Sequence, residues 1–170
     1  MFDVPSVYTW ASAYDPYRLI DGNSGPDGRD PLSNRVGNVS DGHSYPWPRA
    51  PTYIPGQTQM IGEYGGVGAF VDGKEWAPGR CHTYLKAADP DTEGGIYINM
   101  TVMLKDLKAS GVSACIYTQI TDTELECDGF LCVTFLGYPS PLGCALTLPF
   151  SHLNSTPCNA CLSPHPLQQL

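Results

Sequence analysis

A single carboxylate, Glu63, follows an apolar segment in the sequence TQMIGEYGG, which spans residues 58–66. The segment is rich in residues that strands favour, and an aromatic residue and two glycines follow the carboxylate. A strand that only had to turn could do so with Gly65 and Gly66 alone. Glu63 is therefore either a solvated residue at a strand end or a reagent that the strand positions for chemistry.

Polar residues also follow three other strand-like segments, which are YRLID at 17–21, RVGNVSDGH at 35–43 and SACIYTQI at 113–120. Helical patterns separate some of these segments, and strand, helix, strand units with continuous apolar strands indicate a parallel sheet. In such folds the chemistry lies at the carboxyl ends of the strands. The polar residues at the four ends are Asp21 and Asn23; Asp41, His43 and Tyr45; Glu63 and Tyr64; and Gln119 and Asp122.

Two helices are expected to support this sheet, which makes the fold class α/β. SVYTWASAY at 6–14 can form a helix with Ser6 as its cap. The second predicted helix lies at 95–110, and Gly111 can end it. We expect its face of Ile96, Met103 and Leu107 to pack on the strands. The full apolar stripe is Ile96, Met100, Met103, Leu104 and Leu107.

Acids, amides and aromatic residues at one end of a parallel barrel are typical of a sugar-binding site. Sugars need polar partners for their hydroxyl groups and flat apolar surfaces, which Trp47 and Trp76 could supply. Ordinary structural roles remain open for two of the candidates. Asp41 could cap the DGHSYP turn, and Trp76 could be a packed aromatic residue.

Composition limits the partners of the chain. Its 170 residues include 17 acidic and 9 basic ones, for a net charge of −8, so nucleic acid is not an expected partner. No charged residue occurs in 129–170. Prolines interrupt the apolar part of that stretch, which argues against a membrane span. We interpret 130–170 as an irregular, Pro-rich tail that is disordered or non-native.

Cysteines and sequons bear on compartment and cofactors. CNAC at 158–161 lacks the second pair of ligands that a zinc finger needs, so neither a metal nor a cofactor is expected. Cys115 is predicted to be a buried free thiol. Sequons occur at Asn38, Asn99 and Asn154, and they could be glycosylated only if the chain enters the secretory pathway. No signal peptide is visible at the N-terminus, and the compartment stays open.

Four motifs together resemble a known family. DGNSG at 21–25, NVSDGHSYPWP at 38–48, MIGEYGGVGAFVDGKEW at 60–76 and GVSACIYTQITDTELECDG at 111–129 resemble, in order and spacing, the catalytic barrel of glycoside hydrolase family 2. This is the β-galactosidase, β-glucuronidase and β-mannosidase group. The resemblance covers residues 1–129. It implies a partial (β/α)8 TIM barrel, of which this chain supplies about the last four βα units, followed by the tail at 130–170.

The resemblance implies a retaining β-glycosidase that acts on a β-linked carbohydrate, with Glu63 as its nucleophile. The candidate substrate contacts are Asp41, His43, Tyr45, Tyr64, Trp76, Gln119 and Asp122. The family's acid/base glutamate lies in an Asn-Glu pair, and this sequence contains no such pair. It also has Lys74 where the family has His, and Asp128 where Asn is expected.

The missing acid/base implies that the isolated chain is inactive. A full-length parent would supply the first half of the barrel and β-sandwich domains. Two alternatives remain beside the enzyme fragment. One is a carbohydrate-binding module that does not cleave its ligand, and the other is a structural half-barrel that folds with a complementary chain.

Overall fold

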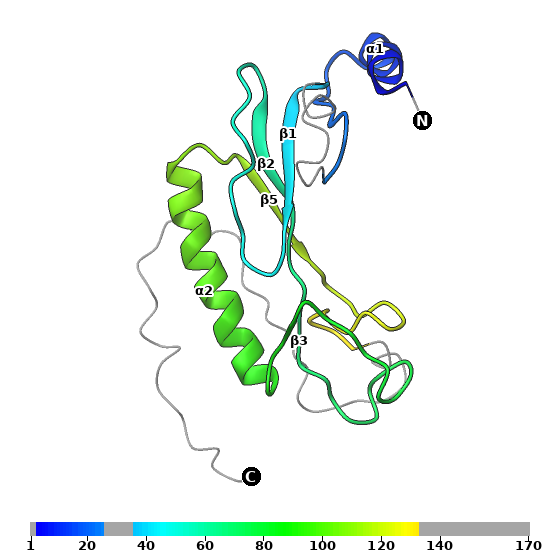
Figure 1. The fold of residues 1–170 in the computed structure, drawn as a ribbon, viewed down its shortest axis with the longest axis vertical. Coiled ribbons are helices and arrows are strands. Elements are labelled where there is room, and N and C mark those ends of the chain that lie inside the picture. Colours follow the sequence, from blue (N-terminus) through cyan, green and yellow to red (C-terminus); the bar gives the residue numbers. More distant parts are fainter. Residues whose placement is uncertain (1–2, 26–35, 133–170) are drawn as a thin grey trace, which may run out of the picture.

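The computed structural model describes residues 3–25 and 36–132, which form a mixed α/β fold with parallel strands, as predicted (Figure 1). In chain order the elements are α1 (Val4–Tyr14), β1 (Val39–Ser44), β2 (Thr58–Gly65), β3 (Val67–Gly68), β4 (Leu85–Lys86), α2 (Pro90–Ala109) and β5 (Ala114–Thr118). Strands β1, β2 and β5 form a parallel sheet in that order, and β3 pairs in parallel with β4. Three of the four predicted strands are therefore present.

The segment at 17–21 is not a strand, which corrects the prediction from YRLID. Only Asp21 makes a sheet-like contact, a single antiparallel bridge with Gly37. Tyr17 and Leu19 are exposed. The segment therefore lacks the burial on both faces that stabilises a strand within a parallel sheet.

The N-cap of helix α1 lies three residues before the predicted cap, Ser6. The carboxylate of Asp3 accepts hydrogen bonds from the backbone N–H and the hydroxyl of Ser6, so Asp3, not Ser6, is the N-cap. Pro5 fits the first turn because the amides there have no partner within the helix. No residue of α1 is buried.

Helix α2 lies along the sheet and contributes to the core (Figure 1). It begins at the N-cap Asp89, whose carboxylate accepts a hydrogen bond of 2.7 Å from the amide of Thr92. Met100 is fully buried in the core, whereas Met103 is 38% exposed. This corrects the predicted face, because at 100° per residue Met103 falls at the edge of the apolar stripe. The core residues are Ile61, Tyr64, Val67, Ala87, Met100 and Val112, and Ile96, Leu104 and Leu107 pack against them.

Met100→Ala is expected to lower the free energy of unfolding by about 2 to 5 kcal/mol, because it removes a fully buried side chain and leaves a cavity. Met103→Ala is the matched control, since it deletes the same atoms from the solvent side of the helix. Urea titrations of the two variants measure the difference. Equal losses in both would show that α2 does not pack through Met100.

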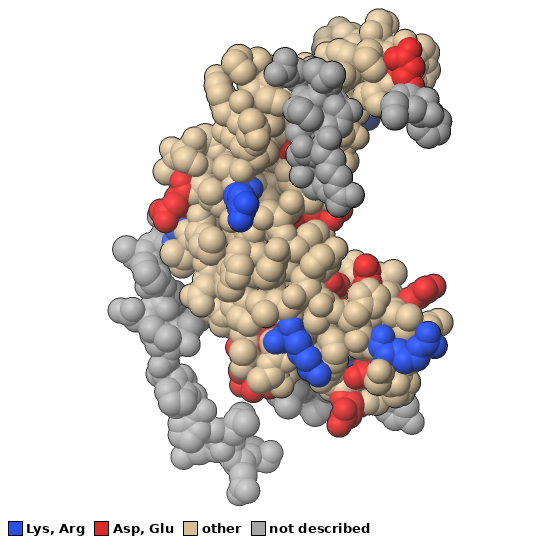
Figure 2. Space-filling view, viewed as in Figure 1, with Lys and Arg blue, Asp and Glu red and all other residues tan. Residues whose placement is uncertain are grey.

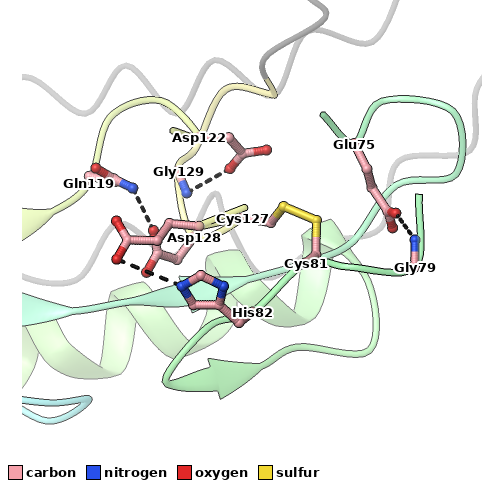
Figure 3. Close-up of a disulfide and its surroundings, with 10 residues drawn as sticks. Glu75, Gly79, Cys81, His82, Gln119, Asp122, Cys127, Asp128 and Gly129 are labelled. Atoms are coloured by element: carbon pink, nitrogen blue, oxygen red, sulfur yellow. Dashed lines mark hydrogen bonds and ion pairs between the residues drawn. A yellow bond between two sulfur atoms is a disulfide. The ribbon is translucent and has the colours of Figure 1, made fainter. Parts of the chain in front are cut away.

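A disulfide joins the loop before β4 to the loop after β5. Cys81 and Cys127 are bonded across a sequence separation of 46 residues (Figure 3). Cys115 has a free thiol, as predicted, although it is half-buried. Beside the bond, the amide of His82 donates to the carbonyl of Leu125 and the amide of Cys127 donates to the carbonyl of His82, so the two segments are joined by both covalent and hydrogen bonds.

The folded chain continues past residue 129. Phe130 stacks on Tyr117, and the amide of Leu131 donates to the carbonyl of Ile120. Residues 133–170, and with them most of the predicted tail, the CNAC motif and the sequon at Asn154, lie outside the described residues. Within the described ranges, neither helix combines the length and the apolarity that a membrane crossing needs.

Candidate active site

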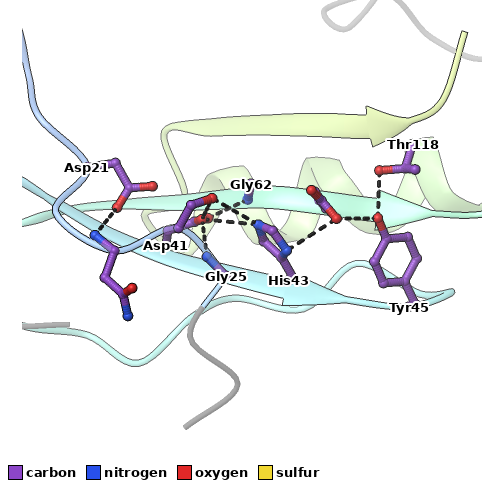
Figure 4. Close-up of polar contacts among 10 residues, drawn as sticks. Asp21, Gly25, Asp41, His43, Tyr45, Gly62 and Thr118 are labelled. Atoms are coloured by element: carbon purple, nitrogen blue, oxygen red, sulfur yellow. Dashed lines mark hydrogen bonds and ion pairs between the residues drawn. The ribbon is translucent and has the colours of Figure 1, made fainter. Parts of the chain in front are cut away.

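The carboxyl ends of β1, β2 and β5 bring together side chains from the three strands and the turn after β1 (Figure 4). The parallel register of β1 and β2 sets His43 opposite Glu63. Tyr45 follows β1 directly, and Thr118 is the last residue of β5. The structure thus gathers three predicted site residues, Glu63, His43 and Tyr45, together with Thr118, which was not predicted.

Two side chains hold one oxygen of the Glu63 carboxylate. The Tyr45 hydroxyl donates a hydrogen bond of 2.5 Å to Oε2. Nδ1 of His43 lies 3.2 Å from the same oxygen. The Glu63 side chain remains 42% exposed, so the carboxylate is oriented by protein groups and still reaches solvent.

The Tyr45 hydroxyl keeps its hydrogen and donates it to Glu63. Burial, reinforced by the hydrogen bond to Glu63, raises its pKa well above the ordinary value for tyrosine. Its oxygen also lies 2.8 Å from Oγ1 of Thr118. Because a hydroxyl carries one hydrogen, Thr118 donates to Tyr45 while Tyr45 donates to Glu63.

Asp41 is buried next to His43, and backbone amides hold its carboxylate. Its carboxylate accepts hydrogen bonds from the amides of Gly62 at 2.6 Å and Gly25 at 2.8 Å. One of its oxygens lies 3.3 Å from Nε2 of His43. Asp41 therefore orients His43 toward Glu63 (Figure 4). Asp21 lies close enough to Asp41 to feel its charge, and burial, with a smaller contribution from that charge, raises the pKa of Asp21.

The two glycines after Glu63 make room for aromatic rings. Gly65 and Gly66 both have positive φ values, of 105° and 61°. A Cβ at Gly66 would lie 2.5 Å from the ring of Tyr84, and one at Gly65 would lie 2.5 Å from the ring of Tyr117. Glycine is thus needed at both positions for conformation and for space.

Tyr84 is a candidate site residue that the sequence did not reveal. Its ring stacks on that of Tyr45 with 3.9 Å between centroids, and Tyr84 is 60% exposed. The pair forms a flat aromatic surface beside the Glu63 carboxylate. No motif marks Tyr84 in the sequence, and only the pairing of β3 with β4 places it here.

Two predicted contacts lie away from the Glu63 network. Tyr64 is buried in the core and meets Tyr117 edge to face, which corrects its assignment as a substrate contact. It follows Glu63 directly and has a packing role beneath the site. Trp76 is exposed on the loop between β3 and β4. Trp47, the other candidate aromatic surface, is also exposed.

Gln119 and Asp122 organise the loop that follows β5 (Figure 3). The amide of Gln119 donates a 2.7 Å hydrogen bond to Asp128, and Asp122 accepts one of 2.9 Å from the amide of Gly129. Burial raises the pKa of both aspartates. These contacts give Gln119 and Asp122 positioning roles in the loop that the disulfide at Cys127 anchors.

Glu93 is a buried acid beneath this loop. It is 8% exposed, and its Oε1 atom has no hydrogen-bond partner among the described residues. Burial raises the pKa of Glu93 to about 7, the amide of Ala69 opposes that shift, and the charges of Asp122 and Asp128 add to it. Tyr117, whose hydroxyl is also buried without a described partner, feels the charge of Glu93.

The raised pKa predicts a pH-dependent stability. The folded state holds the Glu93 proton more tightly than the unfolded state, so stability falls as pH rises from about 4.5 to about 7. A shift of this size corresponds to about 3 kcal/mol at most.

Glu93→Gln should therefore gain stability over the parent above about pH 7 and gain little near pH 4.5. Urea titrations across this range test it, and Glu124→Gln, at an exposed position, is the control. A Glu93→Gln protein with the pH slope of its parent would contradict the assignment.

The surface charges and the possible metal ligands of the described residues were compared with the position of the site. Lys and Arg form separate small patches on the face shown in Figure 2, with acidic residues between them. Among the described residues, no group of three or more His, Cys, Asp or Glu side chains could hold a metal ion. In comparisons with known proteins, the chain matches no protein-family model and no curated protein sequence.

Proposed function

We propose that this chain carries the nucleophile of a retaining β-glycosidase and that the nucleophile is Glu63. The observation that supports this most is the carboxylate itself, which a parallel strand presents to solvent while Tyr45 and His43 hold one of its oxygens. Fixing one oxygen orients the other, which is the preorganisation that a nucleophilic carboxylate requires.

In the proposed reaction, Glu63 attacks the anomeric carbon of a β-glycoside as the bond to the leaving oxygen breaks. A glycosyl ester of Glu63 forms with inverted configuration, and attack by water then restores the original configuration. Tyr45 and His43 position the carboxylate, and the exposed ring of Tyr84 is a surface on which a sugar ring can stack. Asp41 acts on the sugar only through His43.

The fold proposal follows the same resemblance. We assign β1, β2 and β5 to the last four βα units of a (β/α)8 barrel, because they are parallel, adjacent and bear polar residues at their carboxyl ends. The acid/base carboxyl belongs to the part of such a barrel that this sequence does not include. The chain should therefore hydrolyse alkyl β-glycosides no faster than buffer, since acid assistance contributes about 10² to 10⁴ in rate.

A second function, carbohydrate binding without cleavage, is supported by the Tyr45 and Tyr84 stack. This surface could hold a sugar whether or not Glu63 attacks it. The two proposals differ in a single measurable step, which is the formation of a bond between Glu63 and the sugar.

The test uses 2,4-dinitrophenyl β-galactoside, β-glucuronide and β-mannoside, whose leaving group needs no proton from an acid. If Glu63 is the nucleophile, the chain should release about one equivalent of dinitrophenolate per molecule in a burst and then nearly stop, because no base activates water for the second step. Binding of the glycosides without a burst would support the carbohydrate-binding function. Neither binding nor a burst would reject both.

A further inference from the structure

A sequon on the outer surface of α2 is in a position to carry a glycan. Asn99 is exposed, and Thr101, two residues later, supplies the hydroxyl that the sequon requires. Thr101 is half-buried, and its hydroxyl donates a 3.0 Å hydrogen bond to the carbonyl of Tyr97. A group attached to the Asn99 amide would project from the helix into solvent.

The sequon at Asn38 has a different environment. The side-chain oxygen of Asn38 accepts a 3.2 Å hydrogen bond from the amide of Ile20, and Ser40 of the same sequon is fully buried. The Ser40 hydroxyl donates to the carbonyl of Thr52. A glycan at Asn38 would have to leave the protein between packed segments, so Asn99 is the better placed of the two described sequons.

The disulfide supplies independent evidence for the compartment that glycosylation requires. Bonds such as that between Cys81 and Cys127 form and persist in oxidising environments, including the lumen of the endoplasmic reticulum. N-linked glycans are attached in the same compartment. The disulfide and the exposed sequon depend on different chemistry, and both fit a chain that folds in the endoplasmic reticulum.

Exposed apolar side chains surround Asn99. Ile98, Val102 and Met103 are all exposed on the outer side of α2. Residues three and four positions apart on a helix are neighbours, so Val102 and Met103 lie next to Asn99. A glycan at this position would shield an apolar surface that is otherwise open to water.

We propose that Asn99 is an N-glycosylation site and that the chain folds in the secretory pathway. The donor is a lipid-linked oligosaccharide diphosphate that carries N-acetylglucosamine at its reducing end. The side-chain nitrogen of Asn99 forms a bond to the anomeric carbon, the bond from that carbon to the diphosphate breaks, and the amide loses one proton as the lipid diphosphate leaves. This inference does not depend on the activity of Glu63.

The test expresses the full chain behind a secretion leader in a eukaryotic host, with Asn154→Gln in every version. Peptide:N-glycosidase F in heavy-oxygen water converts each glycosylated Asn to isotopically marked Asp, and mass spectrometry of total protein locates it. The expected result is a mark at Asn99 and none at Asn38. Entry into the pathway is verified by removal of the leader and by the bond between Cys81 and Cys127.

Two variants separate glycosylation from any structural effect of substitution. Thr101→Ala should abolish the mark at Asn99 although Asn99 itself is unchanged, and Thr101→Ser should retain it. Because the mark is measured on total protein, a variant that folds poorly can still be scored. An unmarked Asn99 in chains that entered the pathway, or a mark at Asn38 alone, would overturn the proposal.

Discussion

Glu63→Ala is expected to reduce the rate of the dinitrophenolate burst by more than about 10³-fold, because the variant has no carboxylate to attack the sugar. Added azide should restore release, since it is small enough to enter the space left by the side chain. Azide would attack from the face that Glu63 occupied. The product should therefore be an α-glycosyl azide, inverted relative to the β-glycoside.

The configuration of the azide product distinguishes the nucleophile from the acid/base. If Glu63 were the acid/base, azide would attack a glycosyl ester formed elsewhere and give a β-glycosyl azide. Asp106→Asn, at an exposed position on α2, is the control and should keep the full burst. A normal burst from the Glu63→Ala protein, or a β-azide product, would show that Glu63 does not have the proposed role.

Removal of the disulfide is expected to lower the free energy of unfolding by about 4 kcal/mol, because a bond across 46 residues restricts the unfolded chain strongly. The change is Cys81→Ser with Cys127→Ser, compared with the parent by urea titration under non-reducing conditions. The loop from 119 to 129, which carries Gln119 and Asp122, should become sensitive to proteases in the variant.

A reducing agent provides the control for this experiment. It should destabilise the parent by about as much as the double substitution does, and it should affect the double variant less, since that variant has already lost the bond between residues 81 and 127. Equal stability of the oxidised parent and the double variant would contradict the prediction.

The sequence predicted the strand that carries Glu63 because that segment combines a strong strand propensity with an abrupt change to polar and glycine residues. Helix α2 was also predictable from its apolar period and from Gly111 after its end. Met103 was assigned to the buried face wrongly, because a sequence pattern shows which residues share a broad stripe and not where the stripe meets solvent.

Other parts of the site depend on contacts between distant segments. Tyr84 reaches Tyr45 only through the pairing of two-residue strands, which are too short to leave a period in the sequence. The pairing of Cys81 with Cys127 could not be chosen among seven cysteines. Tyr64 adjoins Glu63 in sequence and yet faces the core, since consecutive residues of a strand point to opposite faces.

A mass-spectrometric peptide map shows directly whether Glu63 forms a covalent bond with the sugar. The chain is treated with 2,4-dinitrophenyl 2-deoxy-2-fluoro-β-glycosides, in which fluorine slows breakdown of the glycosyl ester. We predict one label per chain, on Glu63 in the peptide containing IGEYGG, and none in the Glu63→Gln variant. A label on Asp41, Asp122 or Glu124 that spares this peptide, or no label at all, would show that Glu63 is not the nucleophile.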